Sequence, residues 1–235
     1  MKIFVAPFAS LFRALREGLS AFPPRKGSFM ETVKTTKKFD VRRLVFTALM
    51  GAVSIVLAEL LKFGVPVMPS FIKFDFSDSP AMLASLTMGP VSGVFVCVIK
   101  NVWGCFTTSS GCVGELQNCI LGVGLVLPAG IITHKKEKFS RAVVGCLAGA
   151  VTMALVSFPA NYFIIYPLFT NMMPMEAIIG MYRKILPSAD SLAKCLLIFN
   201  VPFTFVKGLS ASLFSVLLYK KLRPVFSLIY RRENG

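Results

Sequence analysis

The sequence predicts an all-α integral membrane protein with six transmembrane helices and both termini in the cytoplasm. Of its 235 residues, 55% are hydrophobic, and the mean hydropathy is +0.70, whereas a soluble domain needs a larger polar share for its surface. The apolar residues gather in runs that approach or exceed the roughly 20 residues needed to cross a hydrocarbon core about 30 Å thick. The basic residues gather between these runs, which is typical of a multi-pass membrane protein.

Four apolar runs are each long enough to span the bilayer, at residues 44–62, 115–134, 142–169 and 195–219. The region between the first two runs is more broken. There, SPAMLASLTM and VSGVFVCVIKNVWGCF are separated by Gly89-Pro90, which is a turn signal. We interpret these two segments as helices, the first of them short, which gives six crossings.

The basic residues determine the predicted orientation. They lie in the N-terminal region, in the loop after the fourth helix and in the C-terminal tail, and six spans put all three groups on the cytoplasmic side. The net charge of +15 therefore indicates topology, and we expect no nucleic-acid partner. The predicted organisation is a basic cytoplasmic extension at 1–40, whose start resembles an amphipathic surface helix, a membrane domain at 41–223 and a basic tail at 224–235.

The sequence contains no signature of an enzyme. It lacks a GxxxxGK[ST] nucleotide loop, an HExxH metal motif and a GxSxG elbow, and its single histidine, His134, allows no Ser/His/Asp set. The six cysteines form no CxxC pair and are interpreted as packing residues, although Cys105 and Cys112 flank a short loop. We predict no catalytic residue, no metal and no cofactor, so that uphill transport would need an ion gradient or another protein.

Several ionisable residues lie inside or at the edge of the predicted spans. A charge at the bilayer centre costs about 2.5–3.5 kcal/mol on insertion scales, so such residues usually face a polar cavity or a partner. Glu115 and Lys207 lie among other polar side chains and are candidates for a functional site. Glu59 and Lys100 lie near predicted helix ends, where we expect them to reach water by snorkelling.

The first predicted helix carries a strip of small residues in the segment ALMGAVS. Ala48, Gly51 and Ala52 lie close together on consecutive turns. Small residues allow another helix to approach closely. This strip is therefore predicted to contact a helix of a partner protein or another helix of this chain.

Four segments, in this order, resemble the substrate-binding S components of energy-coupling factor (ECF) vitamin transporters, and within them the riboflavin-specific branch. The resemblance covers about Arg43 to Phe226, and the segments are FIKFDFSDSPAMLASLTMGPVSGVFVCVIKN, GELQNCILGVGLVLPAGII, PANYFIIYPLF and VPFTFVKGLSASLFSVLLYKKLRP. It implies a six-helix S component in a bacterial cell membrane that captures riboflavin from outside. It also implies docking onto one transmembrane coupling protein, through Ala48 and Ala52, and onto two ATP-binding subunits.

The resemblance also implies roles for individual residues. Glu115 in GELQN matches a glutamate that reaches the ribityl hydroxyls, and Lys207 in FVKG matches a lysine near the same polar chain. Asn161 in ANYF matches an asparagine whose amide presents a donor and an acceptor to the edge of the isoalloxazine ring. Thr204 stands where the family often has an asparagine, a departure that bears on fine ligand preference.

The loop before the second helix, VMPSFIKFDFSDSP, supplies both apolar and polar groups, which a flavin site requires. We expect Met68 and Phe71 to belong to its apolar lining, in a closed pocket under the outer loops. Asp78 is expected to cap the second helix, with direct ligand contact as the alternative. Asp75 and Lys73 are expected to fix the loop by pairing with each other or with a neighbour.

Other functions remain open at this point. Within transport, the ligand could instead be another vitamin or a flavin such as FMN or roseoflavin. A membrane enzyme acting on lipids could use Glu115 and Lys207 as acid and base, but it would need a paired carboxylate, a metal cluster or a nucleophile set, and none is found. A purely structural membrane protein would leave Glu115, Asn161 and Lys207 unexplained.

Overall fold

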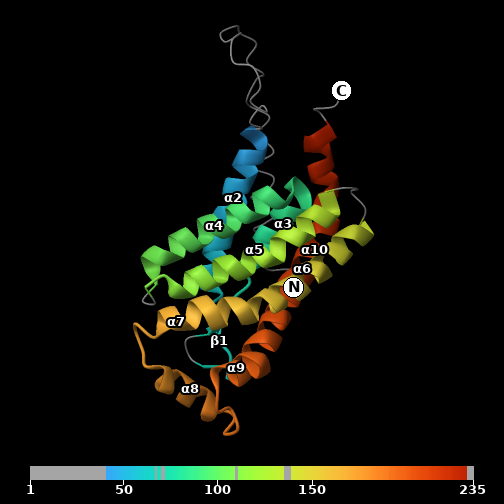
Figure 1. Ribbon diagram of the computed structural model, residues 1–235. Coiled ribbons are helices and arrows are strands. Elements are labelled where there is room, and N and C mark those ends of the chain that lie inside the picture. Colours follow the sequence, from blue (N-terminus) through green and yellow to red (C-terminus); the bar gives the residue numbers. More distant parts are fainter. Residues whose placement is uncertain (1–40, 67, 70–71, 109–110, 135–138, 232–235) are drawn as a thin grey trace, which may run out of the picture. The chain divides into compact units, whose positions relative to one another are not determined.

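The computed structural model describes residues 41–66, 68–69, 72–108, 111–134 and 139–231 (Figure 1). The predictions for the N-terminal extension at 1–40 and for Phe71 lie outside these residues. Within the described ranges the regular secondary structure is helical apart from one pair of two-residue strands. In this described part of the chain, five helical stretches are long and apolar enough to cross a membrane, so the chain is a multi-pass membrane protein.

The long helices agree closely with the apolar runs of the sequence. The first membrane helix is α2, and α4 and α5 follow the short helix α3. Two later spans are composite, because each contains a π-helical turn within a longer helical stretch. The bounds are α2 Val41–Leu60, α4 Pro90–Thr107, α5 Val113–His134, α6 Phe139–Ala160 with η1 Asn161–Ile165 and α7 Tyr166–Phe169, and α9 Leu192–Cys195 with η2 Leu196–Asn200 and α10 Val201–Arg231.

The short second helix of the prediction is α3, Asp78–Met88. At 11 residues it extends only about 16 Å, which is less than the hydrocarbon thickness. Nine of its residues are buried, because α2, α4, α5 and α10 all pack against it. The predicted turn after it is confirmed: Gly89 has a φ of 94°, which glycine tolerates, and Pro90 opens α4.

Helix α6 packs against both α5 and α10, and α5 and α10 each also pack against α3. Gly149 on α6 shows how close the approach is, because a Cβ atom there would lie 2.2 Å from the Leu125 carbonyl oxygen of α5. Large apolar side chains such as Phe95, Trp103 and Leu155 point outward from the bundle. Such outward apolar surface is expected where helices contact lipid instead of water.

One end of the bundle, which we call the loop end, carries the two strands and the helix α8, Met175–Arg183 (Figure 1). Strands β1, Phe63–Gly64, and β2, Lys73–Phe74, pair antiparallel. Beneath α8 lies a buried cluster that includes Met68, Tyr166, Tyr182 and Phe199. The segment between α7 and α9 is thereby fixed to the ends of the membrane helices.

Candidate ligand-binding site

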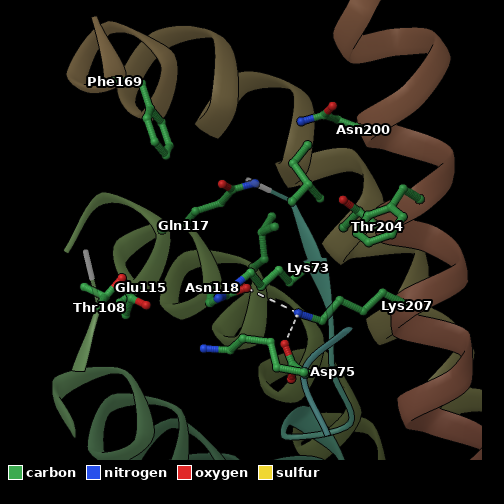
Figure 2. Close-up of a pocket in the computed structure, with 15 residues that line it drawn as sticks. Lys73, Asp75, Thr108, Glu115, Gln117, Asn118, Phe169, Asn200, Thr204 and Lys207 are labelled. Carbon is green, nitrogen blue, oxygen red and sulfur yellow. Dashed lines mark hydrogen bonds and ion pairs between the residues drawn. The ribbon is translucent and has the colours of Figure 1, made fainter. Parts of the chain in front are cut away.

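A cavity of about 310 Å³ lies at the loop end of the bundle (Figure 2). Its volume is at the lower limit of the range of about 300–1,000 Å³ that is usual for ligand pockets. Its walls combine charged, amide and aromatic side chains from the first loop, α5, α7 and the η2–α10 helix. The lining includes Asp75, Glu115, Asn118, Phe169, Asn200, Phe203, Thr204 and Lys207.

Glu115 lies in the first turn of α5 and lines the cavity, as the sequence predicts for a site residue. A carboxylate is favourable there because the amino end of a helix carries partial positive charge. Its side chain crosses α4 at Gly104, where a Cβ atom would lie 2.8 Å from Glu115 Cγ. The absence of a side chain at Gly104 therefore gives Glu115 its place at the cavity wall.

Lys207 projects from α10 into the same wall (Figure 2). Its ammonium donates hydrogen bonds to Asp75 Oδ2 at 3.0 Å and to Asn118 Oδ1 at 3.3 Å. Asp78 Oδ2 lies 3.6 Å from the same nitrogen. Asp75 was predicted to pair with Lys73 or with a neighbour; its partner is Lys207, which is far away in the chain. Lys73 is exposed at the rim of the cavity.

Asp75 stays ionised because of these contacts. Burial alone would raise the pKa of its carboxyl group, but the charges of Lys207 and Lys100 together with hydrogen bonds from Ser77 and Lys207 outweigh burial and lower it. The cavity wall therefore contains an ion pair between the Asp75 carboxylate and Lys207 Nζ, at 3.0 Å.

Asp78 and Lys100 occupy places that differ from those predicted. The N-cap of α3 is Ser77, which forms no capping bond through its side chain, and Asp78 is the first residue of the helix. Its carboxylate instead lies 2.5 Å from Lys100 Nζ, and both side chains are buried. The prediction that Lys100 reaches water was wrong, because this ion pair satisfies its charge inside the protein. Glu59, by contrast, is exposed and accepts a hydrogen bond from Thr107.

Asn161 lies behind the cavity wall, at the start of the π-helical turn η1. Its amide nitrogen donates to the Ser157 carbonyl at 2.7 Å and to the Ser157 hydroxyl at 3.2 Å, and that hydroxyl is 3.0 Å from the hydroxyl of Thr204 in the wall. Asn161 Oδ1 is buried and has no hydrogen-bond partner among the described residues. The π-helical turns η1 and η2 lie next to this region, and such turns are frequent at functional sites.

Two apolar residues were predicted for the lining. Met68 is buried in the cluster beneath α8, beside Tyr166 and Tyr182, and does not line this cavity. The structure does not describe Phe71. The aromatic groups that do line the wall are Phe169 and Phe203.

The strip of small residues on α2 is divided between two faces. Ala48 and Ala52 are exposed, whereas Gly51 is buried against α4, where a Cβ atom would lie 3.1 Å from the Ile99 side chain. Gly51 therefore serves packing within this chain and is not part of the exposed strip. The close contact within this chain is thus made at Gly51, whereas Ala48 and Ala52 lie on the exposed face of α2.

The sequence interpretation missed Asn118 and Asn200, which also line the cavity. The signal that could have found them is helical spacing, because residues three or four apart share one helix face. Asn118 lies three residues after Glu115, and Asn200 lies four residues before Thr204. The amide of Asn200 is held by Tyr182, which donates to its Oδ1 at 2.6 Å, and by Tyr166, which accepts from its Nδ2 at 3.2 Å.

Comparison with known proteins gives consistent results. Residues 42–219 match the family model described as "ECF transporter, substrate-specific component". The riboflavin transporter FmnP of Bacillus subtilis (strain 168) is 30% identical over 188 residues, which are 78% of this chain and 93% of that protein. The riboflavin transporter RibU of Staphylococcus aureus (strain TCH60) is 29% identical over 181 residues, 77% of this chain and 90% of that protein.

A solved structure, described as "Structure and mechanism of the S component of a bacterial ECF transporter", has the same fold. It superposes with a TM-score of 0.62 at 28% identity and covers 79% of this chain and 97% of that chain. The family match extends over most of the membrane region in which the cavity lies. The chain therefore belongs to the family of substrate-specific components of ECF transporters, which are transport proteins and not enzymes, as the sequence predicts.

Proposed function

We propose that this protein binds riboflavin in the cavity at the loop end and delivers it for uptake by an ECF transporter. The observation that carries the proposal is the convergence of Glu115, Thr204 and Lys207 on one cavity, with the aromatic rings of Phe169 and Phe203 in the same walls. A flavin combines a flat aromatic ring with a hydroxylated chain, and it needs such a mixture of groups. The relatives named as riboflavin transporters support this choice of ligand.

Each polar residue has a proposed role. Glu115 accepts hydrogen bonds from ribityl hydroxyls, and Lys207 donates to the same chain. Asn161 pairs with the polar edge of the isoalloxazine ring, because its buried Oδ1 is an acceptor without a hydrogen-bond partner among the described residues. Thr204 connects the two regions through its contact with Ser157.

The size of the cavity indicates how binding proceeds. Riboflavin has about 27 non-hydrogen atoms, and at about 0.3 kcal/mol per atom it would bind with roughly micromolar affinity. Nanomolar affinity needs about 0.45 kcal/mol per atom, and therefore nearly complete burial of the ligand. Because Asn161 lies behind the wall of the 310 Å³ cavity, we propose that the wall around Thr204 opens toward Asn161 as the ring enters.

The protein acts with partners in this proposal. All six helices, α3 included, form the membrane domain, both termini are cytoplasmic, and the cavity opens outward, in agreement with the basic N-terminal and C-terminal regions. The exposed Ala48 and Ala52 of α2 contact a transmembrane coupling protein, and two ATP-hydrolysing subunits supply the energy. The chain itself binds and releases the ligand without a covalent step.

The test uses the purified full-length protein. We expect a preparation from riboflavin-containing cells to show flavin absorption, and stripped protein to bind one equivalent of riboflavin with quenching of its fluorescence. Lys207→Met should weaken this binding. Asn101→Leu should not, because Asn101 is a buried residue of α4 that does not line the cavity. Stripped protein that leaves riboflavin fluorescence unchanged would remove riboflavin as the ligand. Competition by FMN or roseoflavin then measures preference among flavins.

A further inference from the structure

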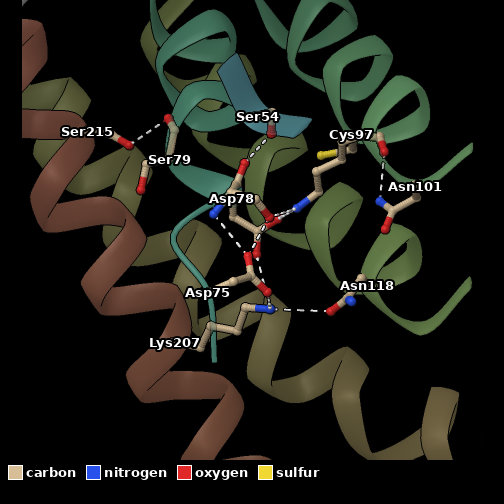
Figure 3. Close-up of polar contacts among 11 residues, drawn as sticks. Ser54, Asp75, Asp78, Ser79, Cys97, Asn101, Asn118, Lys207 and Ser215 are labelled. Atoms are coloured by element: carbon tan, nitrogen blue, oxygen red, sulfur yellow. Dashed lines mark hydrogen bonds and ion pairs between the residues drawn. The ribbon is translucent and has the colours of Figure 1, made fainter. Parts of the chain in front are cut away.

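Among the described residues, four buried charged side chains form one ion-pair cluster beside the cavity (Figure 3). The exposed fractions of these four residues are 4% for Asp75, 1% for Asp78, 5% for Lys100 and 4% for Lys207. They come from three parts of the fold: the segment at the start of α3, the middle of α4 and the first two turns of α10. Only Asp75 and Lys207 line the cavity, so half of the cluster lies beyond the reach of a ligand there.

The contacts within the cluster assign each lysine mainly to one carboxylate. Lys100 Nζ lies 2.5 Å from Asp78 Oδ1. Lys207 Nζ lies 3.0 Å from Asp75 Oδ2 and farther, 3.6 Å, from Asp78 Oδ2. Ser77 joins the two pairs, because its hydroxyl accepts from Lys100 at 2.8 Å and donates to Asp75. Its backbone N–H also donates to Asp75 Oδ1, at 2.9 Å.

The cluster contains two carboxylates and two ammonium groups, so its charges balance. In a buried region an uncompensated charge is costly, because the surroundings cannot replace its hydration. If Lys100 lost its charge, Lys207 would be the one cation of the cluster facing both Asp75 and Asp78. Since Asp78 Oδ2 already lies 3.6 Å from Lys207 Nζ, a small movement would draw the ammonium toward Asp78 and away from the cavity wall.

We propose that Lys100 is a positioning residue for ligand binding: by neutralising Asp78, it leaves Lys207 paired with Asp75 at the cavity wall. Lys100 itself does not touch the ligand. The identity of the ligand in this inference rests on the proposed function, whereas the control of Lys207 by Lys100 does not.

The test is a charge-balance cycle in the full-length protein. Lys100→Met leaves two carboxylates and one ammonium, and Asp78→Asn leaves one carboxylate and two ammonium groups. We expect each single variant to weaken riboflavin binding, measured by fluorescence quenching, by about tenfold or more. The double variant Asp78→Asn/Lys100→Met restores one carboxylate and one ammonium, and we expect its affinity to return to within about threefold of the wild-type value.

A role of Lys100 that is purely structural gives a different pattern. Loss of packing and of hydrogen bonds would accumulate, so the double variant would bind no better than the worse single variant, and this result would overturn the proposal. Unchanged affinity in Lys100→Met would overturn it as well. Asn101→Leu is the matched control, since Asn101 is the buried neighbour of Lys100 on α4 and bonds the Cys97 carbonyl, outside the cluster.

A readout without ligand separates this inference from the proposed function. Acetic anhydride labels uncharged lysine amines, and mass spectrometry measures the labelled fraction at Lys207. We expect labelling of Lys207 to fall in Lys100→Met, where two carboxylates hold it, and to rise in Asp78→Asn. If wild-type protein does not bind riboflavin, the proposed function fails and the labelling still decides the inference. Equal labelling of Lys207 in wild type and both variants would refute the positioning role of Lys100. This readout needs no ligand, so it also applies to a variant whose riboflavin binding is too weak to titrate.

Discussion

Lys207 of α10 and Asp75 of the loop before α3 are 132 positions apart in the chain, yet their charged groups lie 3.0 Å apart in the cavity wall (Figure 3). This ion pair joins the first loop of the membrane domain to its last helix. The cavity consequently depends on the folding of both ends of the domain. Binding of a ligand to Lys207 therefore also depends on the position of the first loop, which holds Asp75.

Asp75→Asn is expected to lower both stability and ligand affinity. It removes one partner of a buried ion pair, a change that typically costs about 3–5 kcal/mol because the other charge is left uncompensated. Thermal unfolding of the detergent-solubilised protein and riboflavin titration measure the two effects. Asp190→Asn is the matched control, since its ion pair with Lys194 is exposed at 3.8 Å and contributes little. Equal melting temperatures for the two variants would contradict the importance of the buried pair.

The pH dependence of this pair follows from the lowered pKa of Asp75. A carboxyl group whose pKa is lowered on folding stabilises the protein above its ordinary pKa of 3.8, and this contribution is lost as the pH falls through its value in the folded protein. We therefore expect Asp75 to stay ionised from about pH 8 down to about pH 5 and to contribute no change of stability there. Comparison of wild type with Asp75→Asn across this range isolates the contribution. A stability difference that disappears near about pH 5 would contradict it.

Gly104→Ala is expected to displace Glu115 from the cavity. The added methyl group would lie 2.8 Å from Glu115 Cγ, so the carboxylate must shift. Riboflavin affinity should fall by about tenfold or more, since a hydrogen bond to a charged group contributes about 1.5–3 kcal/mol. Gly180→Ala on α8 is the control, because a methyl group added there would meet no neighbouring atom within 4 Å. A Gly104→Ala protein that binds as tightly as the Gly180→Ala protein would exclude Glu115 from ligand binding.

Hydropathy was sufficient to predict the long helices, because residues that face lipid must be apolar along the whole length of a span. It could not predict the π-helical turns η1 and η2, which leave the apolar pattern unchanged. The cavity was predicted only in part, through Glu115, Thr204 and Lys207. Its remaining wall depends on which faces of α5 and α10 meet, and single-helix patterns do not determine this.

The error on Lys100 has a physical explanation. Considered alone, a lysine within an apolar run is expected to relieve its charge in water. Its actual partner, Asp78, lies at an equal distance in the chain on the other side of Gly89. A turn at Gly89-Pro90 makes α3 and α4 neighbours of opposite direction, so residues equally far from the turn lie at one level. The predicted turn therefore already contained the information for this ion pair.

Tyr182→Phe is expected to lower the stability of the loop end, where Tyr182 holds the cavity residue Asn200. Tyr182, Tyr166 and Asn200 form a closed set of hydrogen bonds, and burial raises the pKa of Tyr182, so that its phenol remains a donor. Removal of this donor takes the bond at Asn200 Oδ1 away, at a cost of about 1–3 kcal/mol. Thermal unfolding measures the loss, with Tyr162→Phe as the control, because Tyr162 is exposed and stacks on Phe158. Equal stability of the two variants would contradict a structural role for the set.

The two faces of α2 predict opposite effects of larger side chains. Ala48→Phe/Ala52→Phe adds bulk to the exposed face, where we propose that the coupling protein docks, so riboflavin uptake by cells should be lost while binding to the purified protein is kept. Gly51→Leu adds bulk against Ile99 of α4 and should lower stability even without a partner.

Leu155→Phe controls for bulk on a lipid-facing surface, since Leu155 is exposed on α6. We expect it to change neither uptake nor binding. Unchanged uptake in Ala48→Phe/Ala52→Phe would remove the docking role of this face. If Leu155→Phe also lost uptake, the loss in the alanine variant would be explained by added bulk in the membrane and not by docking, because α2 and α6 have different neighbours. The assignment of α2 as the docking helix therefore requires that uptake be lost in the alanine variant and retained in Leu155→Phe.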